Sequence, residues 1–149
     1  MKSEKAVKLF LSGLNCSQAI VCTYGADESL AFDLAAKISC GLAGGLETCG
    51  AVSGAILVLG MAFASPDPAD RCIKEHTYEI VSDFNDRFKE KLGTVTCREL
   101  LKKRDIESDC STEENRRNQI HFCANIVSIA AILLEETLIK NRSGKGEKS

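Results

Sequence analysis

The sequence predicts an all-α protein, a single-domain bundle of helices around a central apolar helix at about residues 49–63. Apolar residues recur at helical spacing through most of the chain, and no convincing alternating pattern of a β-strand interrupts them. A length of 149 residues suits one domain, and 44% hydrophobic with 27% charged residues is typical of globular proteins. We expect one helical domain at residues 1–140 and a disordered polar tail at residues 141–149.

Three shorter helices are expected before the central one. The first covers residues 3–12 and places its apolar side chains on one face. Asn15 is the expected N-cap of the second helix, which begins at Cys16 and ends at Gly25. The third begins near residue 27 and has a leucine or isoleucine at every fourth position: Leu30, Leu34, Ile38 and Leu42.

The central helix lies in the stretch CGLAGGLETCGAVSGAILVLGMAF, residues 40–63. Thr48 is its expected N-cap and Cys49 its first residue. Because the helix is apolar on all sides, the other helices should surround it. Glycine in a helix interior costs roughly 1 kcal/mol relative to alanine, so close approach of neighbouring backbones is the expected reason for Gly50, Gly54 and Gly60. The apolar part is too short to span a bilayer, and we expect no membrane insertion.

Two more helices are expected after Pro66 and Pro68. The longer covers about residues 68–91, and its core face consists of Ile73, Thr77, Ile80, Phe84 and Phe88. A capping box, with Thr96 as the N-cap and Glu99 reaching back to it, opens a short helix at about residues 97–103.

A last helix should carry the remaining part of the core. Ser111 and Glu114 form a second capping box, and the helix should end at about Lys140. Its buried stripe is expected to consist of Ile120, Cys123 or Ala124, Val127, Ala131, Leu134 and Leu138.

Eight cysteines are the most informative part of the composition. The N-terminal residues MKSEKAVKLFLSG show an amphipathic pattern rather than that of a signal peptide, so we expect a cytoplasmic location. The cytoplasm keeps structural thiols reduced, and the cysteines therefore indicate redox or metal chemistry rather than a disulfide scaffold. A net charge of -2 gives no electrostatic support to a nucleic-acid partner.

Cysteines that open helices are candidates for reactive thiols, since the positive end of a helix dipole stabilises a thiolate and lowers its pKa. Cys49 opens the buried central helix and is therefore the expected main reactive thiol, the fastest to alkylate at neutral pH. A cysteine on the apolar stripe of the last helix, Cys123, could face the interior. The cysteines that directly follow a cap-type residue are Cys16 after Asn15, Cys49 after Thr48 and Cys97 after Thr96.

The other candidate residues are weaker. We expect packing or incidental roles for the remaining cysteines, which are Cys22, Cys40, Cys72 and Cys110. The only histidines are His76 and His121, and neither has a second ligand at helical spacing, so a surface or packing role is expected. Glu47 precedes Cys49 by two residues and is interpreted as an acid favoured by the helix dipole.

Several of these features occur together in a known family. They are Asn15-Cys16, the glycine-rich segment before Cys49-Gly50-Ala51-x-x-Gly54, Gly93 before Cys97-Arg98-Glu99-Leu100, and Cys123. In them the chain resembles the C_GCAxxG_C_C family of redox-active proteins, over about residues 15–135. The resemblance implies a small helical protein, often encoded beside transporter and oxidoreductase genes. It also implies four characteristic cysteines, which are Cys16, Cys49, Cys97 and Cys123, and leaves out the other four.

The favoured hypothesis is a thiol/disulfide redox protein with Cys49 as the main reactive thiol and another of the four cysteines as its resolving partner. A protein of this kind requires no cofactor, and its partner would be an oxidoreductase or another disulfide-bearing protein. Whether it acts as an enzyme, a thiol-disulfide oxidoreductase, does not follow from the sequence. No C-x-x-C pair occurs, so the site is not of the thioredoxin type.

Two alternatives remain open. In one, the thiolates of Cys16, Cys49, Cys97 and Cys123 bind an iron–sulphur cluster or, less favoured, a zinc ion, and the protein transfers electrons. A related helical domain accompanies iron–sulphur and haem centres in some larger cytochromes, as the resemblance implies. In the other, the chain is a structural or partner-binding bundle with buried thiols. The glycine-rich faces are also compatible with a homodimer.

Overall fold

The computed structural model describes residues 1–45, 47–106 and 109–146, and within them the chain is all-α, as predicted. The only β-structure in these ranges is one isolated bridge. The elements are α1 (Lys2–Leu11), α2 (Cys16–Tyr24), the 3-10 turn η1 (Gly25–Glu28), α3 (Phe32–Cys40), the 3-10 turn η2 (Gly41–Ala43), α4 (Gly50–Phe63), α5 (Arg71–Leu92), α6 (Cys97–Lys103) and α7 (Glu113–Gly146).

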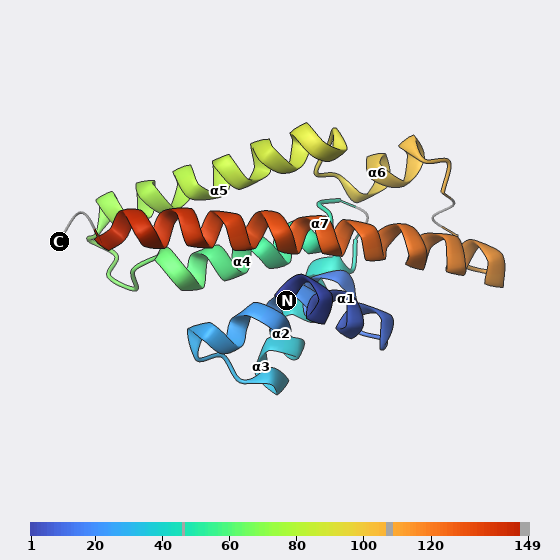
Figure 1. Cartoon of the computed structure of the whole chain (residues 1–149), viewed down its shortest axis with the longest axis horizontal. Coiled ribbons are helices and arrows are strands. Elements are labelled where there is room, and N and C mark those ends of the chain that lie inside the picture. The colour runs from blue at the N-terminus through green and yellow to red at the C-terminus, as the bar shows by residue number, and fades with distance from the viewer. Residues whose placement is uncertain (46, 107–108, 147–149) are drawn as a thin grey trace.

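The long helix α7 runs through the whole molecule, as Figure 1 shows, with α5 on one side and the N-terminal helices on the other. It contacts α1, α2, α4 and α5. The predicted stripe is buried from Val127 onward, but Ile120 is 40% exposed because it lines an open groove with Leu11. By length and composition alone, α7 is also apolar enough to cross a membrane, although 44% of that window is buried in the bundle.

Every residue of α4 is buried or partly buried, and α4 contacts α2, α5 and α7. Its glycines let α2 come close. A Cβ atom at Gly54 would lie 3.0 Å from the backbone oxygen of Ser17 and 3.2 Å from its Cα atom. Gly60 is different, because a Cβ atom there would have no neighbour within 4 Å. Close backbone approach therefore accounts for Gly54 and not for Gly60.

Polar groups at the start of α2 hold α3 in place. Asn15 caps α2 as predicted, in a capping box with Gln18. The side chains of α2 then bond to backbone carbonyls of α3: Ser17 Oγ donates to Ser39 at 2.6 Å, and Gln18 Nε2 donates to Ala36 at 3.0 Å. The Asn15 side-chain amide donates to the carbonyl of Cys40, also at 3.0 Å. These bonds fix the start of α2 where α3 ends.

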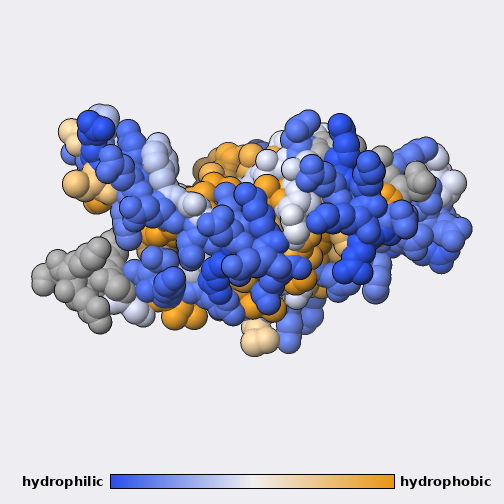
Figure 2. Space-filling model, turned by 90° about the horizontal axis from the view of Figure 1, so that it is seen from above, coloured by the Kyte–Doolittle hydropathy of each residue, from blue (hydrophilic) through white to orange (hydrophobic). Residues whose placement is uncertain are grey.

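Some predicted boundaries and faces were wrong. The third helix is interrupted, since η1 and a turn precede α3, and Leu34 and Ile38 lie exposed on its outer side. The long helix begins later, with Asp70 as its N-cap, and Ile73 in its first turn is 38% exposed. The face shown in Figure 2 is likewise mixed, with hydrophobic patches among hydrophilic residues.

The last helix also differs from its predicted limits. Thr112 rather than Ser111 supplies the first cap, since its Oγ1 accepts the N–H of Asn115 at 3.1 Å. The helix continues to Gly146, beyond the predicted end at Lys140. Residues 141–146 of the predicted disordered tail are therefore helical, and residues 147–149 lie outside the described residues.

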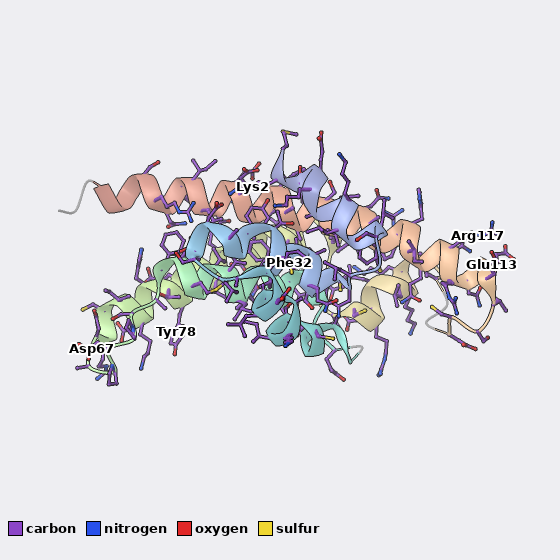
Figure 3. The ribbon with its side chains drawn as sticks, turned by 90° about the horizontal axis from the view of Figure 1, so that it is seen from below. Lys2, Phe32, Asp67, Tyr78, Glu113 and Arg117 are labelled. Atoms are coloured by element: carbon purple, nitrogen blue, oxygen red, sulfur yellow. The ribbon has the colours of Figure 1, made fainter. Side chains whose placement is uncertain are left out.

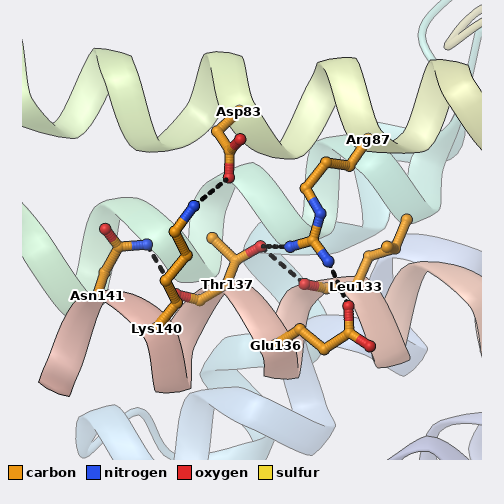
Figure 4. Close-up of polar contacts among 7 residues, drawn as sticks. All are labelled: Asp83, Arg87, Leu133, Glu136, Thr137, Lys140 and Asn141. Carbon is orange, nitrogen blue, oxygen red and sulfur yellow. Dashed lines mark hydrogen bonds and ion pairs between the residues drawn. The ribbon is translucent and has the colours of Figure 1, made fainter.

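A polar layer joins α5 to α7 on the side away from the N-terminus (Figure 4). Arg87 pairs with Glu136 and donates to Thr137 Oγ1 at 3.5 Å, and Lys140 Nζ lies 3.8 Å from an Asp83 carboxylate oxygen. Ion pairs this exposed contribute about 0–1 kcal/mol each. They set how α5 and α7 align, while the apolar core supplies most of the stability.

The glycines of α4 give a matched pair of variants. Gly60→Ala should raise the free energy of unfolding by up to about 1 kcal/mol, because alanine favours the helix and fills open space. Gly54→Ala should instead lower it by about 1 kcal/mol or more, since the added methyl group presses on the backbone of α2. Urea unfolding of both variants measures this, and equal effects would show that α2 and α4 are not in close contact.

Candidate functional site

The four cysteines of the predicted set meet at one small cavity, near the starts of α2, α4 and α6 and beside α7. Cys16, Cys49, Cys97 and Cys123 all line it. The rest of its wall is Gly50 with the apolar side chains Leu100, Leu101, Phe122 and Ile126. The cavity holds about 20 Å³, which is room for about one water molecule. Residues far apart in sequence thus form one cluster of thiols in an apolar pocket.

An isolated antiparallel bridge between Thr48 and Thr96 brings two of these cysteines together. The N–H of Cys49 donates across the bridge at 2.7 Å, to a carbonyl of the segment before α6. The N–H of Cys97 donates back at 2.6 Å, to a carbonyl of the segment before α4. Because side chains alternate along extended backbone, both cysteines lie on the face opposite the two threonines.

This pairing replaces the caps that the sequence predicted. Thr48 is not the N-cap of α4, because Cys49 itself occupies that position. Thr96 is the N-cap of α6, but its side chain makes no capping bond. Glu99 instead accepts a hydrogen bond of 2.5 Å from Thr94 Oγ1. The predicted capping box is therefore wrong, since the backbone of Thr96 takes part in the bridge and Thr94 binds Glu99.

Gly50 makes room for the sulphur of Cys16. A Cβ atom at Gly50 would overlap Cys16 Sγ and lie 2.8 Å from the Cβ atom of Ala43. The thiol of α2 therefore rests directly on the first turn of α4. No side chain larger than hydrogen fits between them without displacing Cys16 or Ala43.

Burial raises the pKa of the Cys49 thiol to about 12, and charge on Cys16 and Cys97 adds to the rise. The backbone N–H groups of Ala51 and Val52 lower it, but only in part. The sequence predicted the opposite, a thiolate stabilised at the start of a helix, and this prediction is wrong. Removal from water destabilises the thiolate by more than the backbone N–H groups at the helix start stabilise it.

The other three thiols of the cavity follow the same rule. Burial raises the pKa of Cys123 to about 12, with further contributions from charge on Cys16, Cys49, Cys97 and Cys110. Burial also raises the pKa of Cys16 and of Cys97. At neutral pH the cluster is therefore a set of neutral thiols.

The cysteines outside the predicted set do not line this cavity. Cys22 is buried on α2, where its sulphur contacts the carbonyl of Phe32 at 3.9 Å, and Cys40 and Cys72 are exposed. Cys110 differs from the other three cysteines for which an incidental role was predicted. It is half-buried, and its charge raises the pKa of Cys123. Nothing in the sequence indicates this, because the contact depends on how the loop before α7 folds.

Neither histidine lines the cavity, and Glu47 is exposed. Among residues 1–45, 47–106 and 109–146, no group of three or more His, Cys, Asp and Glu side chains is arranged to hold a metal ion. Zinc needs four ligands at about 2.0–2.3 Å, and an iron–sulphur cluster needs more space than one water molecule. Four thiols are the right donors for either, but their arrangement here does not fit a zinc ion or a cluster.

Comparison with known families adds one finding. A family described as "Putative redox-active protein (C_GCAxxG_C_C)" matches residues 14–137. The chain belongs to the C_GCAxxG_C_C family. The predicted family is thereby confirmed, and membership places the chain among proteins described as redox-active. The chain matches no curated protein and no solved structure.

The raised pKa values predict the order in which the thiols react. A thiol must lose its proton to attack iodoacetamide, so the exposed Cys40 and Cys72 should be alkylated first at pH 7. The rate at Cys49 should keep rising with pH up to about 12. Peptide mass spectrometry after timed quenching measures both effects, with protein unfolded in urea as the control in which the differences vanish. Cys49 reacting first in the folded protein at pH 7 would contradict the account.

Proposed function

We propose that the protein is a cytoplasmic thiol/disulfide redox protein whose cavity stores two electrons in a dithiol. One observation carries the proposal: four cysteines line a single apolar cavity from which histidines and acids are absent among the described residues. Thiols gathered in this way are close enough for exchange, which needs a second thiol within reach of the first.

Cys16 and Cys49 are the pair best suited to form the disulfide. The N–H of Ala51 lowers the pKa of both thiols against the larger effect of burial, so one amide faces both sulphurs. Of the neighbouring thiols, Cys16 has the largest effect on the pKa of Cys49. Gly50 leaves the space that lets the sulphur of Cys16 reach the first turn of α4.

The reaction consumes a substrate disulfide, R–S–S–R′. A protein thiolate attacks one sulphur and forms a mixed disulfide, while R′S⁻ leaves and takes up a proton. A second protein thiolate then attacks the mixed disulfide, and RS⁻ leaves and is protonated in turn. The net result is RSH, R′SH and a Cys16–Cys49 disulfide, so the protein gives up two electrons and two protons.

The raised pKa values suit storage of the reduced state. Neutral buried thiols react slowly with oxidants, and a water-sized apolar cavity admits little else. A stabilised thiolate favours the reduced form of a couple and makes the corresponding disulfide strongly oxidising. That stabilisation is missing here, which favours a role as electron donor to a disulfide-bearing partner.

Thiol counting tests the proposal in a background where the exposed Cys40 and Cys72 are replaced by serine. Hydroxyethyl disulfide should remove two thiols from the reduced protein and leave no adduct. Peptide mapping should place the internal disulfide between Cys16 and Cys49. Cys49→Ser should abolish that link, and any disulfide formed in this variant should join the other cavity cysteines or Cys110, whereas Cys22→Ser, buried outside the cavity, should keep the Cys16–Cys49 link. A main disulfide in the parent that does not join Cys16 to Cys49, or no loss of thiols from the parent, would refute the assignment.

The metal-binding alternative has its own test. Protein purified without oxygen should be brown if the cavity cysteines hold an iron–sulphur cluster, and the visible absorption should vanish in Cys16→Ser. We expect a colourless protein with less than one iron or zinc per chain, because no three of the described cysteine, histidine or acidic side chains are arranged to hold a metal ion. Stoichiometric metal together with a visible absorption band would favour electron transfer over thiol exchange as the function.

A further inference from the structure

We propose that Cys110 is a relay thiol that accepts an external disulfide and passes it to Cys123, and through it to the cavity. The inference deepens the proposed function and rests on it. It adds a fifth cysteine that lies outside the cavity wall and outside the four expected from the family pattern.

A relay would carry an external disulfide to Cys49, which is buried in the cavity wall. The cavity holds about 20 Å³, so no substrate disulfide larger than a few atoms enters it while the bundle is closed. Cys49 is 5% exposed, whereas Cys16, Cys97 and Cys123 are half-buried, as Cys110 is. Cys110 differs from these three in lying outside the narrow cavity, where a larger disulfide has room.

Cys110 has that position. It lies three residues before Glu113, the first residue of α7, which Figure 3 labels. Its Sγ donates a hydrogen bond to the side-chain oxygen of Gln119. Gln119 and Cys123 are four residues apart on α7, so their side chains are neighbours on one helix face. The sulphur of Cys110 therefore lies beside the turn that carries Cys123.

Two further bonds hold the loop in this place. The Asn115 side-chain amide donates to the carbonyl of Asp109 at 3.2 Å, and Thr112 caps the first turn of α7. Cys110 is half-buried, so part of the residue is open to solvent. Burial is the main cause of the raised pKa of Cys123, and the charge of Cys110 contributes to it together with that of the three other cavity thiols, as expected for neighbouring sulphurs.

The relay consists of a first attack on the substrate disulfide followed by three exchanges, and atoms, protons and electrons balance in each step. The Cys110 thiolate attacks R–S–S–R′ and expels R′S⁻, and Cys123 then attacks the Cys110 sulphur and expels RS⁻. Cys16 attacks Cys123 and releases Cys110, and finally Cys49 attacks Cys16 and releases Cys123. Each attacking thiol gives up one proton and each released thiolate gains one. The two electrons come from Cys16 and Cys49, and Cys110 and Cys123 end as thiols.

Kinetics with glutathione disulfide test the relay in the Cys40→Ser/Cys72→Ser background. Cys110→Ser should slow formation of the Cys16–Cys49 disulfide by about tenfold or more, because access limits exchange with buried thiols. The oxidised end state and the thermal unfolding midpoint should stay unchanged. An unchanged rate in Cys110→Ser would overturn the relay and leave the proposed function intact, as long as the parent still forms its disulfide.

A trapping variant makes the test independent of rates. Cys123→Ser removes the thiol that resolves the first adduct, so glutathione should accumulate on Cys110 and be found there by peptide mass spectrometry. An adduct on Cys16 or Cys97 instead would overturn the relay. If the parent forms no internal disulfide at all, the proposed function fails, and an adduct confined to Cys110 would then mark only a reactive surface thiol and overturn the relay as well.

Discussion

The bridge between the segments before α4 and α6 is the constraint on which the candidate site depends. Two backbone hydrogen bonds, from Cys49 N–H to Val95 and from Cys97 N–H to Glu47, tie together helix starts that are far apart in sequence. Each such bond contributes only about 1 kcal/mol net, so the bridge persists because the apolar bundle holds both helices in place. Cys16 and Cys123 then reach the same point from α2 and α7, which pack against α4.

Burial decides the chemistry of these thiols. A helix start favours a negative charge by roughly 0.3–2 kcal/mol, whereas each unit of pKa corresponds to about 1.4 kcal/mol. A pKa near 12 for Cys49 therefore means that loss of water outweighs the helix. The same apolar wall that keeps the thiols protonated also limits the access of outside disulfides to the buried Cys49. Burial thus has two consequences. It keeps the cavity thiols in the reduced, protonated form, and it makes a thiol outside the cavity, Cys110, useful for exchange with an external disulfide.

Much of the fold could be predicted because it depends on local patterns. Helical periodicity predicted the helices, the asparagine before Cys16 predicted its cap, and interior glycine predicted the close contact at Gly54. What failed depends on tertiary pairing. Thr48 and Thr96 match the pattern of N-caps, yet they pair with each other, and no local signal distinguishes the two uses. The four cysteines followed from the family pattern, while the nearness of Cys110 to Cys123 follows only from the folded loop.

Disulfide mapping of the oxidised wild-type chain tests the central claim, that the cavity cysteines form one redox unit, most directly. The reduced protein is oxidised under native conditions, its free thiols are blocked, and the linked peptides are identified by mass spectrometry. The account predicts that the main link joins Cys16 to Cys49, with any minor internal link confined to the cavity cysteines and Cys110. A main link through Cys22, Cys40 or Cys72, or the absence of links among the cavity cysteines, would contradict it.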